Sequence, residues 1–277
     1  MITSIPYLDF GGNGRPLHFI HANGYPPGSY RLFINELLPH YRVLAMQQRP
    51  LWPHSNPAAM TNWQFFADDL IHFFEQQGLQ NVIGVGHSLG GVATMFAALR
   101  RPELFRALIL IEPVFLPPHI LQMAAVNPDA VTLMPLVESA LRRRNHWHSR
   151  QDAFNRFRRK EVFRRWSDEA LWDYVNHALS PNDAGDYTLA YSREWEAQIY
   201  SYPPLTVWED IPRLTHPTLG IRAAASDTIY PEPWLLWQQL QPSATFVQIE
   251  EAGHMVTMER PSPLAAVILN WLETGIP

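Results

Sequence analysis

The stretch Val82-Ile-Gly-Val-Gly-His-Ser-Leu-Gly-Gly91 decides how the rest of this sequence is read. Its first four residues are typical of a buried strand, and the residues after Ser88 are typical of a helix. Between them lies the pattern Gly-x-Ser-x-Gly, with glycines at 86 and 90, where side chains would collide in a tight turn. A strand, a sharp turn and a helix in this order raise the serine hydroxyl above the edge of a sheet. Ser88 is therefore the candidate nucleophile.

Short apolar runs alternate with longer amphipathic segments along most of the chain, which is typical of an α/β fold: a mostly parallel central sheet with helices on both faces. We predict strands at residues 17–20, 43–46, 82–85, 107–111, 218–221 and 245–249. We predict helices at residues 29–38, 61–78, 88–100 and 264–273.

The alternation stops between residues 113 and 212, where aromatic side chains recur at helical spacing and no convincing strand occurs. The segments on either side of this region need each other to complete one core. We therefore expect an α/β core formed by residues 1–112 and 213–277, into which a helical lid, residues 113–212, is inserted.

The composition limits the classes of function. Hydrophobic residues make up 47% of the 277 residues, which is enough for a large buried core. A formal net charge of −5 argues against nucleic acid as a partner, and the absence of cysteine excludes disulfides and thiol catalysis. No secretory signal and no run of about 18 apolar residues occurs, so we expect a cytoplasmic protein without stable membrane insertion. The oligomeric state stays open.

A serine hydroxyl is a weak nucleophile at neutral pH, so a general base must accept its proton. His254 is the best candidate among the 12 histidines, because it follows the last predicted strand in a loop before the last helix. Loops at the carboxyl ends of parallel strands share one edge of the sheet with the turn at Ser88. We therefore predict that His254 is the base; the alternative is a capping or surface histidine.

The base in turn needs a carboxylate that fixes its tautomer. Asp227 follows the strand predicted at residues 218–221 and gives the chain order Ser, Asp, His. Glu112, at the end of the strand predicted at residues 107–111, is a rival on the same edge of the sheet. We favour Asp227, because Glu112 also fits a strand-end residue that leads into the lid.

The segment His21-Ala-Asn-Gly24 follows the first predicted strand and precedes a helix. A turn here can direct a backbone N–H toward the oxygen of a substrate carbonyl and form an oxyanion hole together with the N–H of Leu89. Asn23 or Gly24 would be the donor. His21 is expected to hold this loop by hydrogen bonds.

These motifs resemble the α/β-hydrolase superfamily, in its lidded serine-esterase-like branch. The resemblance covers residues 17–272, with only the general layout matched in the lid. It implies that Ser88 attacks an acyl carbon, that Asp227 and His254 complete the triad, and that the loop at residues 21–24 forms the oxyanion hole.

The chain departs from the family pattern at two places. Ala22 stands where glycine is usual. The stretch Gln47-Gln-Arg-Pro-Leu-Trp-Pro-His-Ser55 keeps only Arg49 and Ser55 of an acidic, glycine-rich turn found in many relatives. We expect the region around Trp52 to reshape access to the site.

The predicted reaction is hydrolysis of a carboxylic ester through an acyl-enzyme on Ser88. A lid rich in aromatic and leucine side chains favours an apolar short-to-medium acyl group or an aromatic substrate. The same triad would serve C–C bond hydrolysis, acyl transfer or cyanohydrin cleavage, and a ligand receptor that kept the hydrolase shell is an alternative of another class. The expected partner is a small-molecule ester, and no cofactor is expected.

Two features of the lid have more than one interpretation. Basic side chains concentrate between residues 142 and 165, where they could attract an anionic substrate or a membrane surface, or could form the solvated face of lid helices, which we favour. His146 and His148 could lie on one edge of a strand, but in a helical lid they would point to different sides. We therefore expect no metal site.

Overall fold

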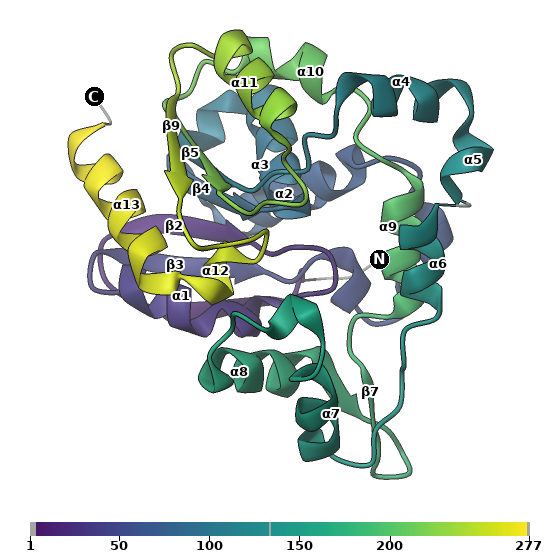
Figure 1. The fold of residues 1–277 in the computed structure, drawn as a ribbon. Helices are drawn as coiled ribbons and strands as arrows, with labels where there is room; N and C mark the ends of the chain where they lie inside the picture. The colour runs from purple at the N-terminus through teal and green to yellow at the C-terminus, as the bar shows by residue number, and fades with distance from the viewer. Residues whose placement is uncertain (1–3, 133, 276–277) are drawn as a thin grey trace.

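The computed structural model describes residues 4–132 and 134–275, and a seven-stranded sheet runs through its centre (Figure 1). The strand order is β1-β3-β2-β4-β5-β8-β9. All neighbouring strands are parallel except β1, which pairs antiparallel with β3 at one edge. The bounds are β1 Tyr7–Gly11, β2 Arg15–Ile20, β3 Tyr41–Met46, β4 Val82–His87, β5 Phe105–Ile111, β8 Thr218–Ala223 and β9 Thr245–Ile249.

The six predicted strands are all present, and the predicted fold class is confirmed. On one face of the sheet, a buried apolar cluster joins the strands to α1 (Arg31–Leu37) and α13 (Pro261–Thr274). On the other face, a second cluster joins them to α2 (Gln64–Gln77), α3 (Leu89–Arg100) and α11 (Pro231–Leu240). The central strands are nearly continuous apolar runs because both of their faces are covered. Sequence reasoning missed β1, whose short run of mixed residues shows no strand pattern.

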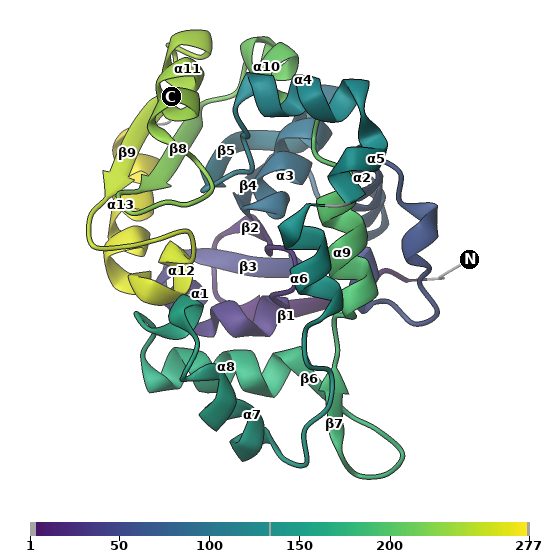
Figure 2. The same ribbon diagram turned by 45° about the vertical axis from the view of Figure 1, so that its right-hand side comes forward.

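The chain between β5 and β8 forms an insertion that extends from the top of the molecule to its bottom in both views (Figures 1 and 2). Its helices are α4 Pro118–Val126, α5 Pro128–Thr132, α6 Pro135–Leu141, α7 Arg150–Phe157, α8 Asp168–Ala178, α9 Arg193–Ser201 and α10 Val207–Asp210. It also contains a short antiparallel hairpin of β6 (Leu179–Pro181) and β7 (Tyr187–Leu189).

This hairpin contradicts the expectation that the insertion has no strand. Its strands have three residues each, which is too short for a periodic pattern. The turn between them closes locally, because the Asn182 side chain accepts the N–H groups of Ala184 and Asp186, both at 3.0 Å. Gly185 lies between these two residues and has a φ of 83°, a conformation that glycine adopts without strain.

The insertion packs closely on the loop that follows β2. The ring of Tyr25 lies 5.2 Å from that of Tyr174 and 6.1 Å from that of Trp166. Gly28 faces the ring of His177 in α8 so closely that a Cβ atom on it would lie 2.3 Å from Nδ1. The large side chains of α7 and α8 belong to the same apolar cluster as α1 and α13. The insertion therefore shares the core of the sheet.

Two histidines near the end of β2 are fully buried. His18 accepts the N–H of Met46 at 3.1 Å and packs against the rings of Phe73 and Phe74. His21 accepts the N–H of Gln48 at 3.2 Å. Burial lowers the pKa of His18 to about 3 and that of His21 to about 4. Both rings are therefore neutral in the folded chain. None of the helices formed by the described residues is long and apolar enough to cross a membrane.

We expect this burial to make the fold sensitive to mild acid. Between pH 6.5 and about 4 the unfolded chain protonates both imidazoles and the folded chain does not, so the free energy of unfolding falls as the pH falls. The loss from pH 7 to pH 5 is about 2 kcal/mol per histidine. Imidazole NMR signals of His18 and His21 should remain those of neutral rings at pH 5. Titration of either ring near 6.5 would contradict the prediction.

Candidate active site

Ser88 lies in a strained turn directly after β4. Its φ is 58° and its ψ is −120°, a backbone conformation that non-glycine residues rarely adopt. Its N–H donates to the carbonyl oxygen of Ile111 at 3.0 Å, which ties the turn to the end of β5. A Cβ atom on Gly86 would lie 2.2 Å from the carbonyl oxygen of Gly90, and one on Gly90 would lie 2.3 Å from that of Ile20. The two glycines thus allow the close packing that the pattern predicted.

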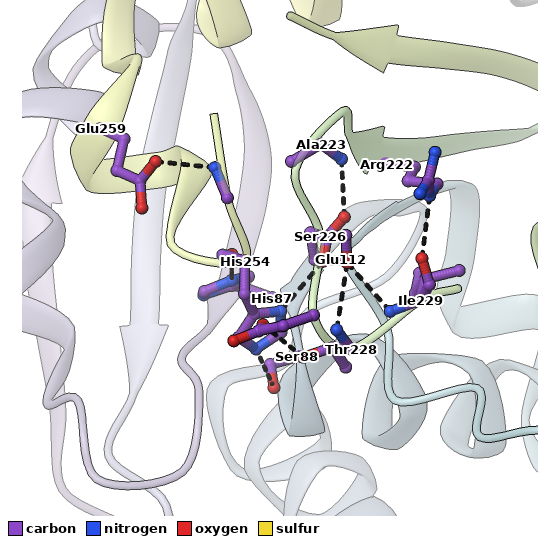
Figure 3. A network of polar contacts seen from close by, with 12 residues as sticks. His87, Ser88, Glu112, Arg222, Ala223, Ser226, Thr228, Ile229, His254 and Glu259 are labelled. Carbon is purple, nitrogen blue, oxygen red and sulfur yellow. Dashed lines mark hydrogen bonds and ion pairs between the residues drawn. The ribbon is translucent and has the colours of Figure 1, made fainter. Parts of the chain in front are cut away.

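His254 lies against Ser88, as Figure 3 shows. It comes from the loop between β9 and α12 (Val256–Glu259). Its Nε2 is 3.0 Å from the Ser88 Oγ, and its Nδ1 is 3.0 Å from a carboxylate oxygen of Glu112. Because a carboxylate only accepts, Nδ1 carries the proton and Nε2 is free to accept the serine O–H. Ser88, His254 and Glu112 thus form one hydrogen-bonded line, the arrangement that an activated nucleophile requires.

The carboxylate beside His254 belongs to Glu112 and not to Asp227, so the expected position of Asp227 is corrected. Asp227 is exposed, and among the residues that the structure describes its carboxylate accepts only a long hydrogen bond, 3.5 Å, from the neighbouring Thr228 hydroxyl. The register of the parallel strands explains the difference, because His87 at the end of β4 pairs with Ile111 at the end of β5. Ser88 and Glu112, each one residue further on, therefore lie side by side.

The loop that contains Asp227 contacts Glu112 through other residues. Glu112 is fully buried, and its Oε1 accepts the N–H of Ala223 at 2.6 Å. Its Oε2 accepts the hydroxyl of Ser226 at 2.5 Å in addition to His254 (Figure 3). Three donors thus satisfy a carboxylate that has no contact with water. The residue of this loop that matters for the site is Ser226, directly before Asp227.

The loop at residues 21–24 lies beside the turn at Ser88. The N–H of Ala22 donates to the Tyr30 hydroxyl at 2.9 Å, and that of Tyr25 donates to the carbonyl oxygen of Ala22 at 3.3 Å. The N–H groups of Ala22 and Tyr25 are therefore occupied, and Asn23 and Gly24 remain the candidate donors that the sequence predicted. Leu89, directly after Ser88, is the first residue of α3, so the N–H of Leu89 has no acceptor within the helix. His21 holds the loop through its hydrogen bonds, in keeping with the sequence.

His87 contacts the site residues in a way that sequence reasoning missed. Its Nε2–H donates to the carbonyl oxygen of His254 at 2.8 Å, and its Nδ1 accepts the Tyr30 hydroxyl at 3.0 Å. Burial, and then the neighbouring His254, lowers the pKa of His87 well below 6.5, so the ring is neutral and Nδ1 can accept. The hydrogen bonds run from Ala22 through Tyr30 and His87 to His254. They join three loops that are distant in sequence, and only the fold reveals them.

A strained serine at a strand–helix turn, hydrogen-bonded to a histidine and through it to a buried carboxylate, is the arrangement typical of hydrolases with a nucleophile elbow. The chain belongs to the α/β-hydrolase family, whose model matches residues 19–267.

Known proteins share this family and fold. The chain is similar to the abhydrolase domain-containing protein ACTT2 of Alternaria alternata, at 24% identity over 70% of this chain and 84% of that protein. It is also similar to an esterase/lipase-type protein of Haemophilus influenzae, at 26% identity over 84% of this chain and 74% of that protein. Among solved structures, it is similar to E-2-(acetamidomethylene)succinate hydrolase, with a TM-score of 0.80 and 18% identity over 98% of this chain and 95% of that one. At that identity the likeness concerns the fold.

A pair of conservative substitutions distinguishes the two carboxylates. Glu112→Gln removes the acceptor that orients His254, so kcat for ester hydrolysis should fall by about 10²–10⁴-fold. Asp227→Asn, the matched control, should leave kcat within about twofold, since exposed sites away from the machinery are tolerant. The rates are measured with p-nitrophenyl acetate, after circular dichroism has shown that both variants fold. A large loss in Asp227→Asn with little loss in Glu112→Gln would reverse the assignment.

Proposed function

We propose that this protein hydrolyses carboxylic esters through an acyl-enzyme on Ser88, with His254 as the base and Glu112 as the acid that orients it. The observation that carries the proposal is the continuous line from Ser88 Oγ through His254 to Glu112, with both hydrogen bonds at 3.0 Å. Asp227 has no part in this proposal.

The steps follow from the geometry. His254 Nε2 accepts the proton of Ser88 as Oγ attacks the acyl carbon, and the imidazolium that forms is stabilised by the buried Glu112 carboxylate. The N–H of Leu89, together with that of Asn23 or Gly24, stabilises the oxyanion. His254 then returns the proton to the leaving alcohol. A water molecule, deprotonated by His254, attacks the acyl-enzyme; as the bond between the acyl carbon and Ser88 Oγ breaks, His254 returns the proton to Oγ and the acid leaves.

We further propose that residues 113–212 form the lid and select an apolar acyl group or an aromatic substrate. The insertion contacts the loop that would form the oxyanion hole, since the Asn23 side-chain amide donates to the carbonyl oxygen of Glu196 in α9 at 3.2 Å. It also contacts the unusual turn after β3, where the indole of Trp195 donates to Ser55 at 2.9 Å. Trp52 of that turn is buried beneath Arg49, 4.5 Å from the ring centre. The departures from the family pattern thus lie where the insertion meets the core.

Ser88→Ala tests the chemistry directly. The variant should lose hydrolysis of p-nitrophenyl butyrate by at least about 10³-fold, because no other nucleophile replaces the serine. It should also lose covalent labelling by a fluorophosphonate probe, while Ser180→Ala, an exposed serine of β6, keeps both. Activity that survived in Ser88→Ala would refute the acyl-enzyme. A wild-type chain that neither reacts with the probe nor hydrolyses esters would support the receptor alternative.

A second candidate, hydrolysis of a substrate that carries a negative charge, rests on one cavity of the insertion. The cavity has a volume of about 480 Å³ and is lined by five basic side chains against two acidic ones: Arg142, Arg143, Arg144, Arg156 and Lys160 against Glu138 and Glu196. Tyr25, from the loop after β2, lines it too. Arg143 Nη1 lies 3.4 Å from the place that a Cβ atom on Gly24 would take. The cavity therefore lies beside the proposed oxyanion loop.

The positive charge in this cavity is not balanced locally. Arg143 pairs with Glu196 at 2.5 Å, but within the part of the chain that the structure describes neither Arg156 nor Lys160 has an ion-pair partner. Burial lowers the pKa of Lys160, and the neighbouring Arg143 and Arg156 lower it further. A carboxylate on the substrate would relieve this repulsion.

We expect the double variant Arg156→Gln/Lys160→Gln to reduce kcat/KM for a p-nitrophenyl monoester of glutaric acid by about tenfold, from the loss of two charge contacts. For the neutral p-nitrophenyl butyrate the value should stay unchanged. Arg164→Gln, at an exposed arginine of the same insertion that lies outside the cavity lining, is the control. Salt should slow the anionic ester only. Equal effects on both esters would contradict the proposal that the substrate carries a negative charge.

A further inference from the structure

We propose that His146, His148 and Asp186 form a binding site for a divalent transition-metal ion of the Zn²⁺ class on the insertion. His146 and His148 belong to the segment between α6 and α7, and Asp186 directly precedes β7. The ligand atoms of the three side chains all lie within 4.8 Å of one another. The cluster shares no residue with the active site, so the proposal stands apart from the proposed function.

The distances fit a metal ion with little rearrangement. His146 Nε2 is 2.8 Å from Asp186 Oδ2, and His148 Nδ1 is 3.2 Å from Asp186 Oδ1. In a tetrahedral site with bonds of about 2.0–2.2 Å, neighbouring ligand atoms lie about 3.3–3.6 Å apart. Small rotations of the side chains therefore turn the present hydrogen-bonded cluster into a coordination triad.

The backbone holds both histidines on the same side of the chain. Trp147 forms an antiparallel bridge with Tyr187, with N–H to oxygen distances of 3.0 and 2.8 Å. In an extended segment, residues two apart point to the same side, while the residue between them points to the other. Trp147 accordingly points inward and is fully buried against Phe157, and the histidines face outward. The expectation that the two histidines point to different sides is wrong, because this segment is extended and not helical.

The chemistry of the three ligands selects the class of ion. Two imidazole nitrogens and one carboxylate suit Zn²⁺, Ni²⁺, Co²⁺ and Cu²⁺, whereas Mg²⁺ and Ca²⁺ prefer oxygen ligands throughout. The side chains of His146 and His148 are 50% and 80% exposed, so water can reach the ion and fill its remaining positions. Within the described residues no second group of this kind occurs, so one ion per chain is expected.

A bound ion would clamp two parts of the insertion that are 40 residues apart in sequence. The hydrogen bond from the N–H of Leu189 to the Asn145 side chain, at 2.9 Å, already aligns them. The ion would add a cross-link to a segment that the buried Trp147, its bridge to Tyr187 and a few hydrogen bonds already hold. An ion that binds the folded chain in preference to the unfolded one raises the melting temperature.

The test measures Zn²⁺ binding by tag-free protein stripped with a chelator, using isothermal titration calorimetry and competition with a chromophoric chelator. One Zn²⁺ should bind per chain, and Mg²⁺ and Ca²⁺ should not. Zn²⁺ binding should weaken by at least about tenfold in each of the variants His146→Ala, His148→Ala and Asp186→Asn, because each variant loses one ligand of the ion. His119→Ala, at an exposed histidine of α4, is the matched control and should bind like the wild type.

A second measurement guards against a variant that binds poorly because it is misfolded. Zn²⁺ should raise the melting temperature of the wild type and of His119→Ala, and should leave that of Asp186→Asn unchanged, while all three have the same melting temperature without metal to within a few degrees. Absence of saturable binding at millimolar Zn²⁺ would overturn the proposal. Binding of the same strength in all three ligand variants would overturn it too.

Discussion

The parallel register of β4 and β5 is the constraint on which the site depends. It pairs His87 with Ile111, and each strand then ends in a residue with a positive φ, 58° at Ser88 and 48° at Glu112. Each such residue costs about 1–3 kcal/mol of strain, which persists only where the surroundings over-determine it. Here the Ser88 N–H is bonded to the end of β5 and that of Glu112 to the end of β8, so the sheet itself holds both turns. Ser88 and Glu112 are neighbours because β4 and β5 are neighbouring strands.

The parts of this arrangement that the sequence predicted are those with local causes. The turn at Ser88 depends on glycines two residues away on either side, and the apolar runs of the strands depend on burial of both faces. The position of His254 follows from the rule that loops at the carboxyl ends of parallel strands share an edge. These features need only a few consecutive residues and the direction of the strands.

The parts that were missed depend on contacts between distant segments. The order Ser, Asp, His favoured Asp227, but the choice between it and Glu112 depends on strand register, which no local pattern encodes. In the sequence, His87 is only a variable position of the Gly-x-Ser-x-Gly pattern and Tyr30 only one residue of a predicted helix. In the fold, the two side chains connect the loop at Ala22 to the loop at His254. The extended geometry around Trp147 likewise comes from its bridge to Tyr187, 40 residues further along the chain. The flanking segments have helical periodicity, so nothing in the sequence indicated an extended conformation here.

One short segment of the insertion joins several of these features. Arg143 lies close to Gly24 and forms an ion pair with Glu196. A few residues further on, Trp147 forms the bridge to Tyr187, and His146 and His148 flank it. Because Trp147 anchors this segment in the apolar cluster that also contains Phe157 and Tyr174, its backbone cannot shift without disturbing helices that pack on the loop after β2. The hairpin and Arg143 are thus joined by one short segment that packs in the core. The residues that attach this segment to the core therefore lie within a few positions of Arg143, which lines the cavity beside Gly24.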